Sequence, residues 1–460
     1  MKKNIIISTV ALVSMFSLTG CHIYQKFDVS KQDSQIAREF ADAAAQQPDA
    51  DSFGNMPWEE VFSDPILADL IRQALVSNVD LDNARLNIEV AHANMRGARL
   101  SYLPSLAIAA QGGASSVSNG KLTNWNYTIP LTASWEVDIF GKILNTKRSA
   151  EASYAQSQDY CQAVRSQIIG AVANTYYAIA ALKSQIALVE NTSEIWKENV
   201  ETMRNYKLIG RTNEAAVVQS EANYYNILSQ LSDLRTSLTQ AYNTMALLLR
   251  EQPREYAIPQ LVSYVAPAIA VEGVPMSALA SRPDVRASER ALAVAYYATN
   301  SARAAFYPGL TITANYGFTN SFGSMIKNPG DWIASLVGSL VAPIFSRGQN
   351  IARLQATKAQ QKQALNNFEK TVLSASSEVS NALTSFRNNV EKSDLIKAQV
   401  EDLIKAQDYT KDLFAMGSAT YLEVLTAQTS LLSAQTAQIN CQLQQAQAVI
   451  NLYQSLGGGR

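Results

Sequence analysis

The stretch NWNYTIPLTASWEVD, from Asn124 to Asp138, limits the possible folds of this chain more than any other feature. Apolar side chains alternate with polar ones along it, and only Pro130 interrupts the pattern. Because successive side chains of a strand point to opposite faces, the alternation predicts a strand with one apolar and one polar face. Most of the remaining chain is rich in Ala, Gln and Leu and predicts long helices. The strand needs partner strands, and these must come from elsewhere in the chain.

The chain begins with MKKNIIISTVALVSMFSLTGC, in which two lysines precede an apolar run from Ile5 to Leu18. These are properties of a secretory signal, and the run is too short for a retained membrane span. Leu18-Thr19-Gly20-Cys21 resembles a bacterial lipobox, so we expect Cys21 to carry lipid. The alternative is an ordinary signal peptide with a cysteine at this place by chance. We assign residues 1–20 to a lipoprotein signal peptide and residues 21–57 to a lipid-anchored N-terminal segment.

The rest of the chain contains one pattern twice. ARLSYLPSLAIAAQGG from Ala98 matches ARAAFYPGLTITANYG from Ala302, with Pro104 and Pro308 aligned. YKLIGRTNEAAVVQSE from Tyr206 matches LFAMGSATYLEVLTAQ from Leu413, with Gly210 and Gly417 aligned. We therefore divide the chain into repeat 1 (58–250), a proline-punctuated connector (251–275) and repeat 2 (276–460).

The duplication locates the missing strands. Repeat 1 predicts a hairpin at about 103–138, made of a strand from Leu103 to Gly112 and the alternating strand. Repeat 2 predicts a hairpin at about 308–345, in which Leu310 to Thr319 alternates cleanly. Its second strand, about Trp332 to Phe345, depends on the repeat more than on its own pattern.

Each hairpin is followed by a long helical stretch that contains no proline, from Gly141 to Gly210 and from Gly348 to Gly417. Each stretch would span roughly 100 Å as a helix. Gly210 and Gly417 are predicted helix stops in tight turns, with N-caps of the return helices at positions 213 and 420. The return helices carry apolar residues at coiled-coil spacing, namely Val217, Tyr224, Leu228, Leu231, Leu238, Tyr242, Met245 and Leu249, and in repeat 2 Leu425, Leu432, Ile439, Leu443, Ile450 and Tyr453.

Four strands are too few to close a sheet around a lumen, because their ring would be only about 8 Å across. Three chains would supply roughly twelve strands and a ring of about 24 Å, so a homotrimer is the smallest plausible closure. The alternative, a soluble β-sandwich, would need many more strands. In the barrel the aromatic residues Trp125, Trp135, Tyr102, Tyr307 and Trp332 would form interfacial girdles. The predicted lipid-facing residues are Trp125, Tyr127, Ile129, Leu131, Trp135, Leu310, Ile312 and Tyr316.

The sequence argues against an enzyme and against a nucleic-acid-binding protein. The net charge of −1 provides no basic surface for nucleic acid. His22 and His92 are the only histidines, and neither has a companion at metal-ligand spacing. The sequence contains no G-x-S-x-G, H-E-x-x-H or Walker glycine motif. We therefore expect no enzyme activity, no cofactor and no metal site. Cys161 and Cys441 would differ in height by about 37 Å along the helices, so we expect both to be unpaired.

Five features together resemble the TolC-like outer-membrane efflux channels, in particular the lipoprotein branch that works with RND-type pumps. They are LTGC at Leu18, PWEEVFSDPILADLIRQALVSNVDLDNARLNIEVA at Pro57, SRPDVRASERALAVA at Ser281, AFYPGL at Ala305 and the turns around Gly210 and Gly417. The resemblance implies a mostly α protein in which three protomers close a small membrane β-barrel of about twelve strands. The barrel would continue into an α-helical periplasmic tunnel whose tip meets an adaptor protein. The implied location is the outer membrane of a Gram-negative-type bacterium, with a large periplasmic portion.

In the resembling family, carboxylates just after the second turn form a constriction ring. Alignment from Gly417 places Glu423 and Thr426 there, with Ala216 and Gln219 at the equivalent places of repeat 1. Thr420 and Glu423 also fit a capping box, and one carboxylate can do both. The turn residues predicted to contact an adaptor are Gly210, Arg211, Val217, Gly417, Ser418 and Leu422.

The predicted function is a passive outer-membrane exit duct that conducts small molecules for an inner-membrane pump and its adaptor. Two alternatives stay open. One is the exit duct of a type I protein secretion system, and the other is a lipid-anchored periplasmic coiled-coil scaffold. Arg282 and Asp284 in SRPDV are predicted to form a structural pair that orients the following helix.

Overall fold

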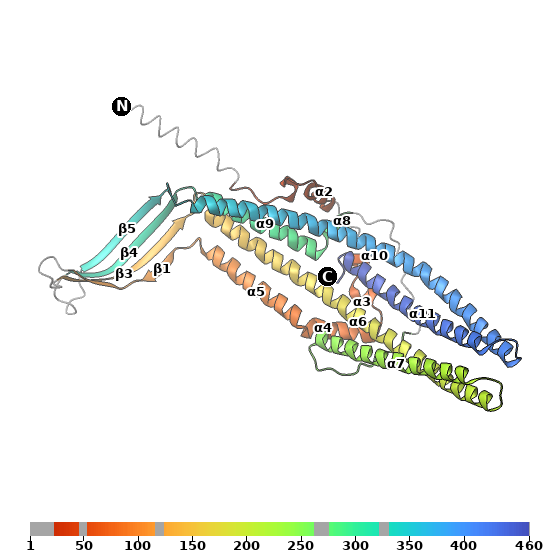
Figure 1. Cartoon of the computed structure of the whole chain (residues 1–460). Helices are drawn as coiled ribbons and strands as arrows, with labels where there is room; N and C mark the ends of the chain where they lie inside the picture. The colour runs from red at the N-terminus through yellow and green to blue at the C-terminus, as the bar shows by residue number, and fades with distance from the viewer. Residues whose placement is uncertain (1–22, 46–52, 116–123, 262–275, 322–330, 460) are drawn as a thin grey trace. The chain divides into compact units, whose positions relative to one another are not determined.

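The structure is a computed structural model that describes residues 23–45, 53–115, 124–261, 276–321 and 331–459 (Figure 1). These residues form two compact units, each of which takes segments from both sequence repeats. The first unit comprises the described parts of Met1–Arg38, Leu86–Asp159 and Arg286–Thr371, and the second those of Glu39–Arg85, Tyr160–Val285 and Val372–Arg460. The predicted signal peptide, Cys21 and residues 262–275 of the predicted connector lie outside the described residues.

The first unit contains a single antiparallel sheet that combines both predicted hairpins. β3 (Asn124–Val137) pairs on one side with β1 (Ser105–Ile108) and β2 (Gln111–Ser115). On its other side it pairs with β4 (Gly309–Ser321), which in turn pairs with β5 (Asp331–Val341). β4, the first strand of repeat 2, is thus a direct partner of β3, the strand with alternating apolar and polar residues (Figure 1).

Two predicted strand limits need correction. The strand expected from Leu103 to Gly112 is interrupted at Ala109 and Ala110, so β1 and β2 are separate segments that both pair with β3. The last strand was expected to reach Phe345 but ends at Val341. Pro343 explains this end, because proline has no N–H to donate to a neighbouring strand.

Pro130 lies within β3, a central strand, where proline is normally excluded. On one side it faces the gap between β1 and β2, where the Ala109 N–H donates to the Pro130 carbonyl at 3.3 Å. On the other side its partner is Gly317. A Cβ at Gly317 would lie 2.2 Å from the Ile129 carbonyl oxygen, so only glycine allows the close approach of β4.

Four helices meet the sheet at one end of the first unit. α5 (Val79–Leu100) and α9 (Pro283–Ala304) end before β1 and β4, whereas α6 (Lys142–Leu208) and α10 (Gln349–Ala415) begin after β3 and β5. Gly141 and Gly348 precede α6 and α10 in the left-handed conformation, with φ of 70° and 74°. Glycine adopts this conformation without steric cost, which suits the abrupt change from strand to helix.

The N-terminal segment is fixed to the same end of the first unit. Asn145 donates from Nδ2 to the carbonyl of Ile23 at 2.9 Å, and Arg148 donates from Nη1 to the carbonyl of Tyr24 at 2.9 Å. The Phe27 N–H donates to the Tyr297 hydroxyl at 3.0 Å. The chain that follows Cys21 is therefore attached to the start of α6 and to α9.

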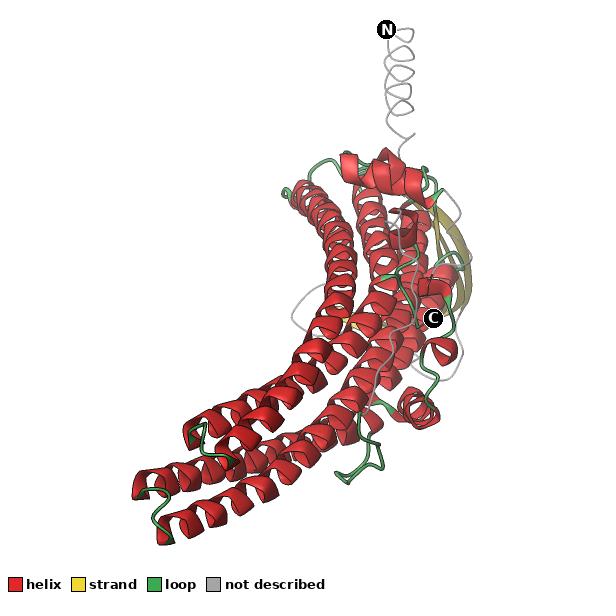
Figure 2. Ribbon diagram, turned by 90° about the vertical axis from the view of Figure 1, so that its right-hand side faces the viewer, coloured by secondary structure: helices red, strands yellow, loops and turns green. Residues whose placement is uncertain are grey.

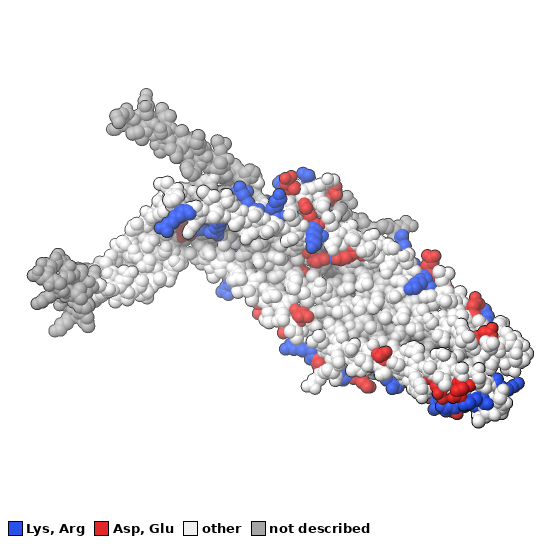
Figure 3. All heavy atoms as spheres, viewed as in Figure 1, with Lys and Arg blue, Asp and Glu red and all other residues white. Residues whose placement is uncertain are grey.

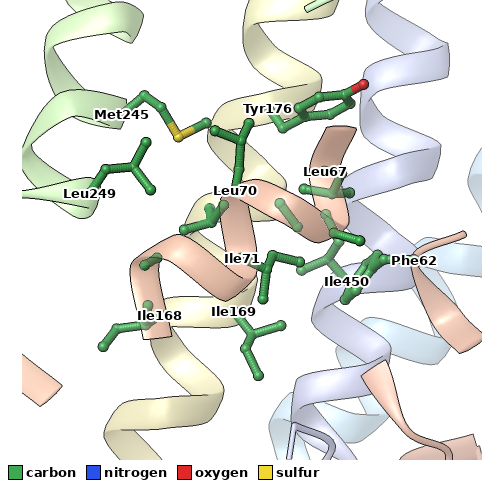
Figure 4. Packing of buried hydrophobic residues seen from close by; sticks show 14 of the residues in the cluster. Phe62, Leu67, Leu70, Ile71, Ile168, Ile169, Tyr176, Met245, Leu249 and Ile450 are labelled. Atoms are coloured by element: carbon green, nitrogen blue, oxygen red, sulfur yellow. The ribbon is translucent and has the colours of Figure 1, made fainter. Parts of the chain in front are cut away.

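The second unit contains two antiparallel helix pairs. α7 (Glu214–Leu249) returns along α6, and α11 (Tyr421–Ser455) returns along α10 (Figures 1 and 2). The main core of this unit lies where α4 (Pro65–Ser77) packs against α6, α7 and α11, with Leu67, Ile71 and Met245 fully buried (Figure 4). The remaining short helices of the described chain are η2 (Val29–Lys31), α2 (Gln35–Ala44), η3 (Phe53–Asn55), α3 (Trp58–Val61) and α8 (Met276–Ala280).

The predicted apolar seams are confirmed except at one position. Leu228 is exposed, and its neighbour Ile227 is buried instead. Ile227 lies three residues after Tyr224, which is the a-to-d step of a heptad, whereas Leu228 lies four residues after it. The buried seam residues are Val217, Leu231, Tyr242, Met245, Leu249, Leu425, Leu432, Ile450 and Tyr453, whereas Tyr224, Leu238, Ile439 and Leu443 are half-buried.

Candidate functional site

The two predicted turns have the same backbone structure. Gly210 and Gly417 are left-handed, with φ of 73° and 79°. The Arg211 N–H donates to the Tyr206 carbonyl and the Ser418 N–H to the Leu413 carbonyl, both at 2.8 Å. The glycine N–H groups donate to the carbonyls of residues 207 and 414 at 3.0 Å. Each long helix therefore ends in a Schellman motif, and the predicted helix stops at Gly210 and Gly417 are confirmed.

The return helices begin at the predicted caps. The Asn213 side chain accepts a hydrogen bond from the Ala216 N–H at 3.1 Å. Thr420 and Glu423 form a complete capping box, because each side chain accepts the backbone N–H of the other. Hydrogen bonds from the Thr420 N–H and hydroxyl lower the pKa of Glu423 below its ordinary value. Glu423 is therefore a carboxylate at neutral pH in the isolated protomer.

The gate residues expected from the resemblance lie on the first two turns of the return helices. Glu423, Thr426 and Gln219 are exposed, and Ala216 is half-buried. A hydrogen bond of 2.8 Å between the hydroxyls of Ser220 and Tyr421 joins α7 to α11 close to these residues. Both hairpin tips are thus held together within one protomer. This bond was not predicted from the sequence, although Ser220 lies three residues after Val217, at a d position of the seam.

The residues predicted to contact an adaptor differ in exposure. Gly210, Arg211, Gly417, Ser418 and Leu422 are exposed. Val217 is only 4% exposed and packs inside the helix pair, which corrects the expectation that its side chain is free for contact. The Arg211 guanidinium lies 5.8 Å from the ring of Tyr206, which orients it over the turn.

Exposed apolar side chains beside both turns were missed by the sequence analysis. Leu208 is 82% exposed and Ile209 67% in the first tip, and Met416 is 71% exposed in the second. Ile209 and Met416 each directly precede the glycine of their turn. The last turn of such a hairpin projects beyond the core between its two helices. An apolar residue immediately before a helix stop could therefore have predicted an exposed apolar side chain at the tip. We refer to these three exposed residues, together with the exposed Leu422, as the apolar crest.

The sheet has the two predicted faces. In register across β3 and β4, Ile129 faces Phe318, Leu131 faces Tyr316 and Trp135 faces Ile312. The predicted lipid-facing residues of the described chain thus share one face, and Ile129, Leu131, Trp135 and Tyr316 are exposed in the protomer. Trp125 lies on β3, but its side chain is outside the described residues.

The opposite face of the sheet carries a row of polar side chains. Thr132 donates from its hydroxyl to Asn315 Oδ1 at 2.8 Å, and Asn315 donates from Nδ2 to the Ser335 hydroxyl at 3.3 Å. One face is therefore suited to lipid and the other to water. No helix of the described chain is long and apolar enough to cross a membrane.

Arg282 forms a larger network than the predicted pair. It is nearly buried, and its guanidinium contacts Asp284 and Glu378, each at 2.7 Å. It also donates to the Ser455 carbonyl at 2.9 Å. Burial opposes ionisation of Asp284, but the bonds and charge of Arg282 outweigh it and lower the pKa of this carboxyl. The network ties the start of α9 to α10 and to the end of α11.

Within the described part of the chain, no three His, Cys, Asp or Glu side chains are grouped so that they could hold a metal ion. Cys161 and Cys441 are free thiols, as expected from their predicted heights. Burial raises the pKa of both thiols, so they are protonated and unreactive at neutral pH.

Comparisons with known proteins agree with this geometry. The model of the outer membrane efflux protein family matches residues 70–249 and 274–458, one stretch in each predicted repeat. Among curated proteins, cation efflux system protein CusC of Escherichia coli O6:H1 is 28% identical over 457 residues, which cover 96% of both chains. Toluene efflux pump outer membrane protein TtgC of Pseudomonas putida is 29% identical over 465 residues, covering 97% of this chain and 94% of TtgC.

Solved structures show the same fold. The outer-membrane channel OprN superposes with a TM-score of 0.83 at 25% identity, covering 94% of this chain and 99% of OprN. The open state of the MtrE outer membrane channel of Neisseria gonorrhoeae superposes with a TM-score of 0.78 at 26% identity, covering 95% and 97%. The chain therefore belongs to the outer membrane efflux protein family.

Proposed function

We propose that the protein is the passive exit duct of a tripartite efflux system, through which small molecules leave the periplasm across the outer membrane. The observation that carries this proposal is the two-faced sheet that leads into long helices in both repeats of an efflux-family chain. The apolar face would meet lipid, and the polar face would line a water-filled passage. Because the sequence contains no nucleotide-binding motif, an inner-membrane pump and an adaptor would supply energy and substrate.

A homotrimer completes this duct. The protomer's sheet has two edges, formed by β1 with β2 and by β5. Counted with β1 and β2 as one interrupted strand, three protomers would contribute about twelve strands and enclose a ring of about 24 Å. Pairing between protomers would also satisfy the backbone groups of both edges, which is necessary inside a bilayer.

The test is the protein mass of the particle extracted in mild detergent, measured by light scattering with the detergent contribution subtracted. We expect three chains per particle, and single-channel conductance after reconstitution into planar bilayers. A monomer that stays soluble without detergent would contradict the duct and support a periplasmic scaffold. The particle could also be a trimer that serves type I secretion. In that case deleting its gene would block protein export and leave the susceptibility of the cells to small toxic molecules unchanged.

We expect lipid attached to Cys21 to anchor the protein at the end of the helices that adjoins the sheet. The segment that follows Cys21 is bound there through Ile23 and Tyr24. The change Cys21→Ser should abolish metabolic labelling with a radioactive fatty acid. Cys161→Ser is the matched control and should retain full labelling. Labelling that persists in Cys21→Ser would contradict the lipobox interpretation.

The exposed turns and the apolar crest of Leu208, Ile209, Met416 and Leu422 are the surface that we propose for the adaptor. Glu423 and Thr426, with Gln219 of repeat 1, are the proposed gate residues just inside it. Three copies of Glu423 brought close to a symmetry axis would attract cations.

Glu423→Gln should therefore lower the cation preference of the channel, measured as the reversal potential in planar bilayers with a salt gradient. Because glutamine can still accept the Thr420 N–H, the capping box is retained and the tip should keep its fold. Glu214→Gln, at an exposed carboxylate that pairs with Lys207, is the control and should leave selectivity unchanged. An unchanged reversal potential in Glu423→Gln would leave this residue with its capping role alone.

A further inference from the structure

On the face shown in Figure 3, basic side chains lie where the helices of the first unit meet the sheet, and the sheet shows almost no charge. The last two turns of α5 contain Arg96 and Arg99 and no acidic residue. The end of α9 contains Arg303. Arg347 precedes α10, whose first charged residue is Arg353 and whose first acidic residue is Glu369. The whole chain has a net charge of −1, so this local excess of cations is not a property of its composition.

The carboxylates of this region are already engaged. Glu136 pairs with Lys142 at 2.9 Å, and Glu151 pairs with Arg99 at 3.0 Å. Asp138 accepts the N–H of residue 144 at 2.6 Å. Among the described residues, no carboxylate lies within ion-pair distance of the exposed side chains of Arg96, Arg347 and Arg353. These three cations are available to an anion from outside the chain.

Arg347 also has an unfavourable backbone. Its φ is 50°, in the left-handed region that favours glycine, and the next residue is Gly348 at 74°. A non-glycine residue in this conformation is uncommon, and such backbone strain often accompanies a functional role.

Aromatic side chains gather at the same end of the sheet, where a membrane boundary would lie if the sheet spans the outer membrane. The rings of Phe140 and Tyr307 stack at 4.8 Å, and Trp135 donates from Nε1 to the Tyr102 carbonyl at 2.9 Å. Aromatic girdles lie at the interfaces of transmembrane sheets. Along their helices, Arg96 and Arg353 each lie four residues, or about 6 Å, from the ends that adjoin the sheet. The head-group layer of one leaflet is about 5–8 Å thick, so the guanidinium groups reach it.

We propose that Arg96, Arg347 and Arg353 form an arginine collar that binds the phosphate groups of anionic phospholipid in the leaflet facing the periplasm. The proposal rests on the proposed function, because it requires the sheet to lie in the outer membrane. Guanidinium is the cation best suited to this ligand, since its planar fork donates two parallel hydrogen bonds to a phosphate. The collar would fix how deeply each protomer sits in the membrane, at the end where the lipid-anchored segment is attached.

The test is a titration of the detergent-purified full-length trimer with phosphatidylglycerol, followed by native mass spectrometry, with phosphatidylcholine of the same acyl chains as reference. The variant carries Arg96→Gln, Arg347→Gln and Arg353→Gln. Each arginine near an anionic lipid surface contributes about fivefold in affinity, so the dissociation constant for phosphatidylglycerol should rise more than tenfold. Added inorganic phosphate should compete only weakly in the wild type, because it lacks the acyl chains that hold a lipid head group against the protein.

The control carries Lys370→Gln, Lys397→Gln and Lys411→Gln, which remove the same charge from exposed positions farther along α10. It should bind phosphatidylglycerol as the wild type does. Equal weakening in both variants, or none in the arginine variant, would overturn the collar. If the arginine variant changes only the reversal potential in planar bilayers, the three side chains line the passage and the proposal is wrong. The mass of the wild-type particle tests the proposed function separately. If the wild type is not a trimer, the duct proposal is wrong, whatever the lipid titration shows.

Discussion

Gly317→Ala is expected to prevent normal folding of the sheet and to reduce strongly the amount of trimer recovered from the outer membrane. An added Cβ would lie 2.2 Å from the Ile129 carbonyl oxygen and 2.6 Å from the Pro130 Cα. Both are backbone atoms of the central strand, so no side chain can move to relieve the overlap. β3 and β4 would have to separate where the two repeats join, and we expect a loss of about 3 kcal/mol or more.

Gly338→Ala is the matched control on the neighbouring strand. A Cβ there would have no atom within 4 Å, and Gly338 is paired with Ile312 in the same sheet. We expect wild-type amounts of trimer, measured by heat-modifiable migration on gels of outer-membrane extracts. Equal recovery of both variants would contradict the close approach of β4 to Pro130.

Arg282→Met is expected to lower the free energy of unfolding by about 2–3 kcal/mol. Arg282 is nearly buried, and its removal would leave two carboxylates and the Ser455 carbonyl without their donor. Asp284 and Glu378 are themselves about half exposed and can rehydrate, which is why the expected loss is below that of a fully buried pair. The measurement is urea unfolding of the detergent-purified protein.

Arg204→Met is the control, because Arg204 also bridges two carboxylates, Glu201 at 2.8 Å and Glu221 at 2.7 Å. This site is exposed, so solvent screens the charges and only a small loss is expected. A similar large loss in both variants would contradict burial as the cause.

The contribution of Asp284 to the free energy of unfolding should also depend on pH. Its pKa in the folded protein lies below the unfolded value of about 3.9, so the folded state stabilises the ionised form. This stabilisation is present at neutral pH and is lost as the pH falls below about 4. The difference between wild type and Arg282→Met should therefore become smaller in acid.

Local features were predictable from the sequence because they depend on near neighbours in the chain. Gly210 and Gly417 end the long helices, and Asn213 and Thr420 begin the return helices, as expected. Helix stops and caps involve residues within about one turn of each other. A short stretch of sequence therefore contains both the donor and the acceptor of each capping hydrogen bond. The alternation in β3 predicted its two faces for the same reason.

The strand limits and the exposure of the tip residues were less predictable. The break between β1 and β2 arises opposite Pro130 of another strand, and the burial of Val217 depends on the helix against which it packs. The Arg282 pair with Asp284 was expected, but Glu378 and Ser455 were not, because they lie far along the chain.

The sequence by itself determined the duplicated plan, the positions of the long helices and their turns, and the two-faced character of the strands. Only the tertiary structure decided that β3 of repeat 1 pairs with β4 of repeat 2, and that Ser220 and Tyr421 join the two tips. The physical reason is the range of the interactions. Periodicity and capping are local, whereas the choice of a distant partner depends on which surfaces the whole chain can bring together and bury.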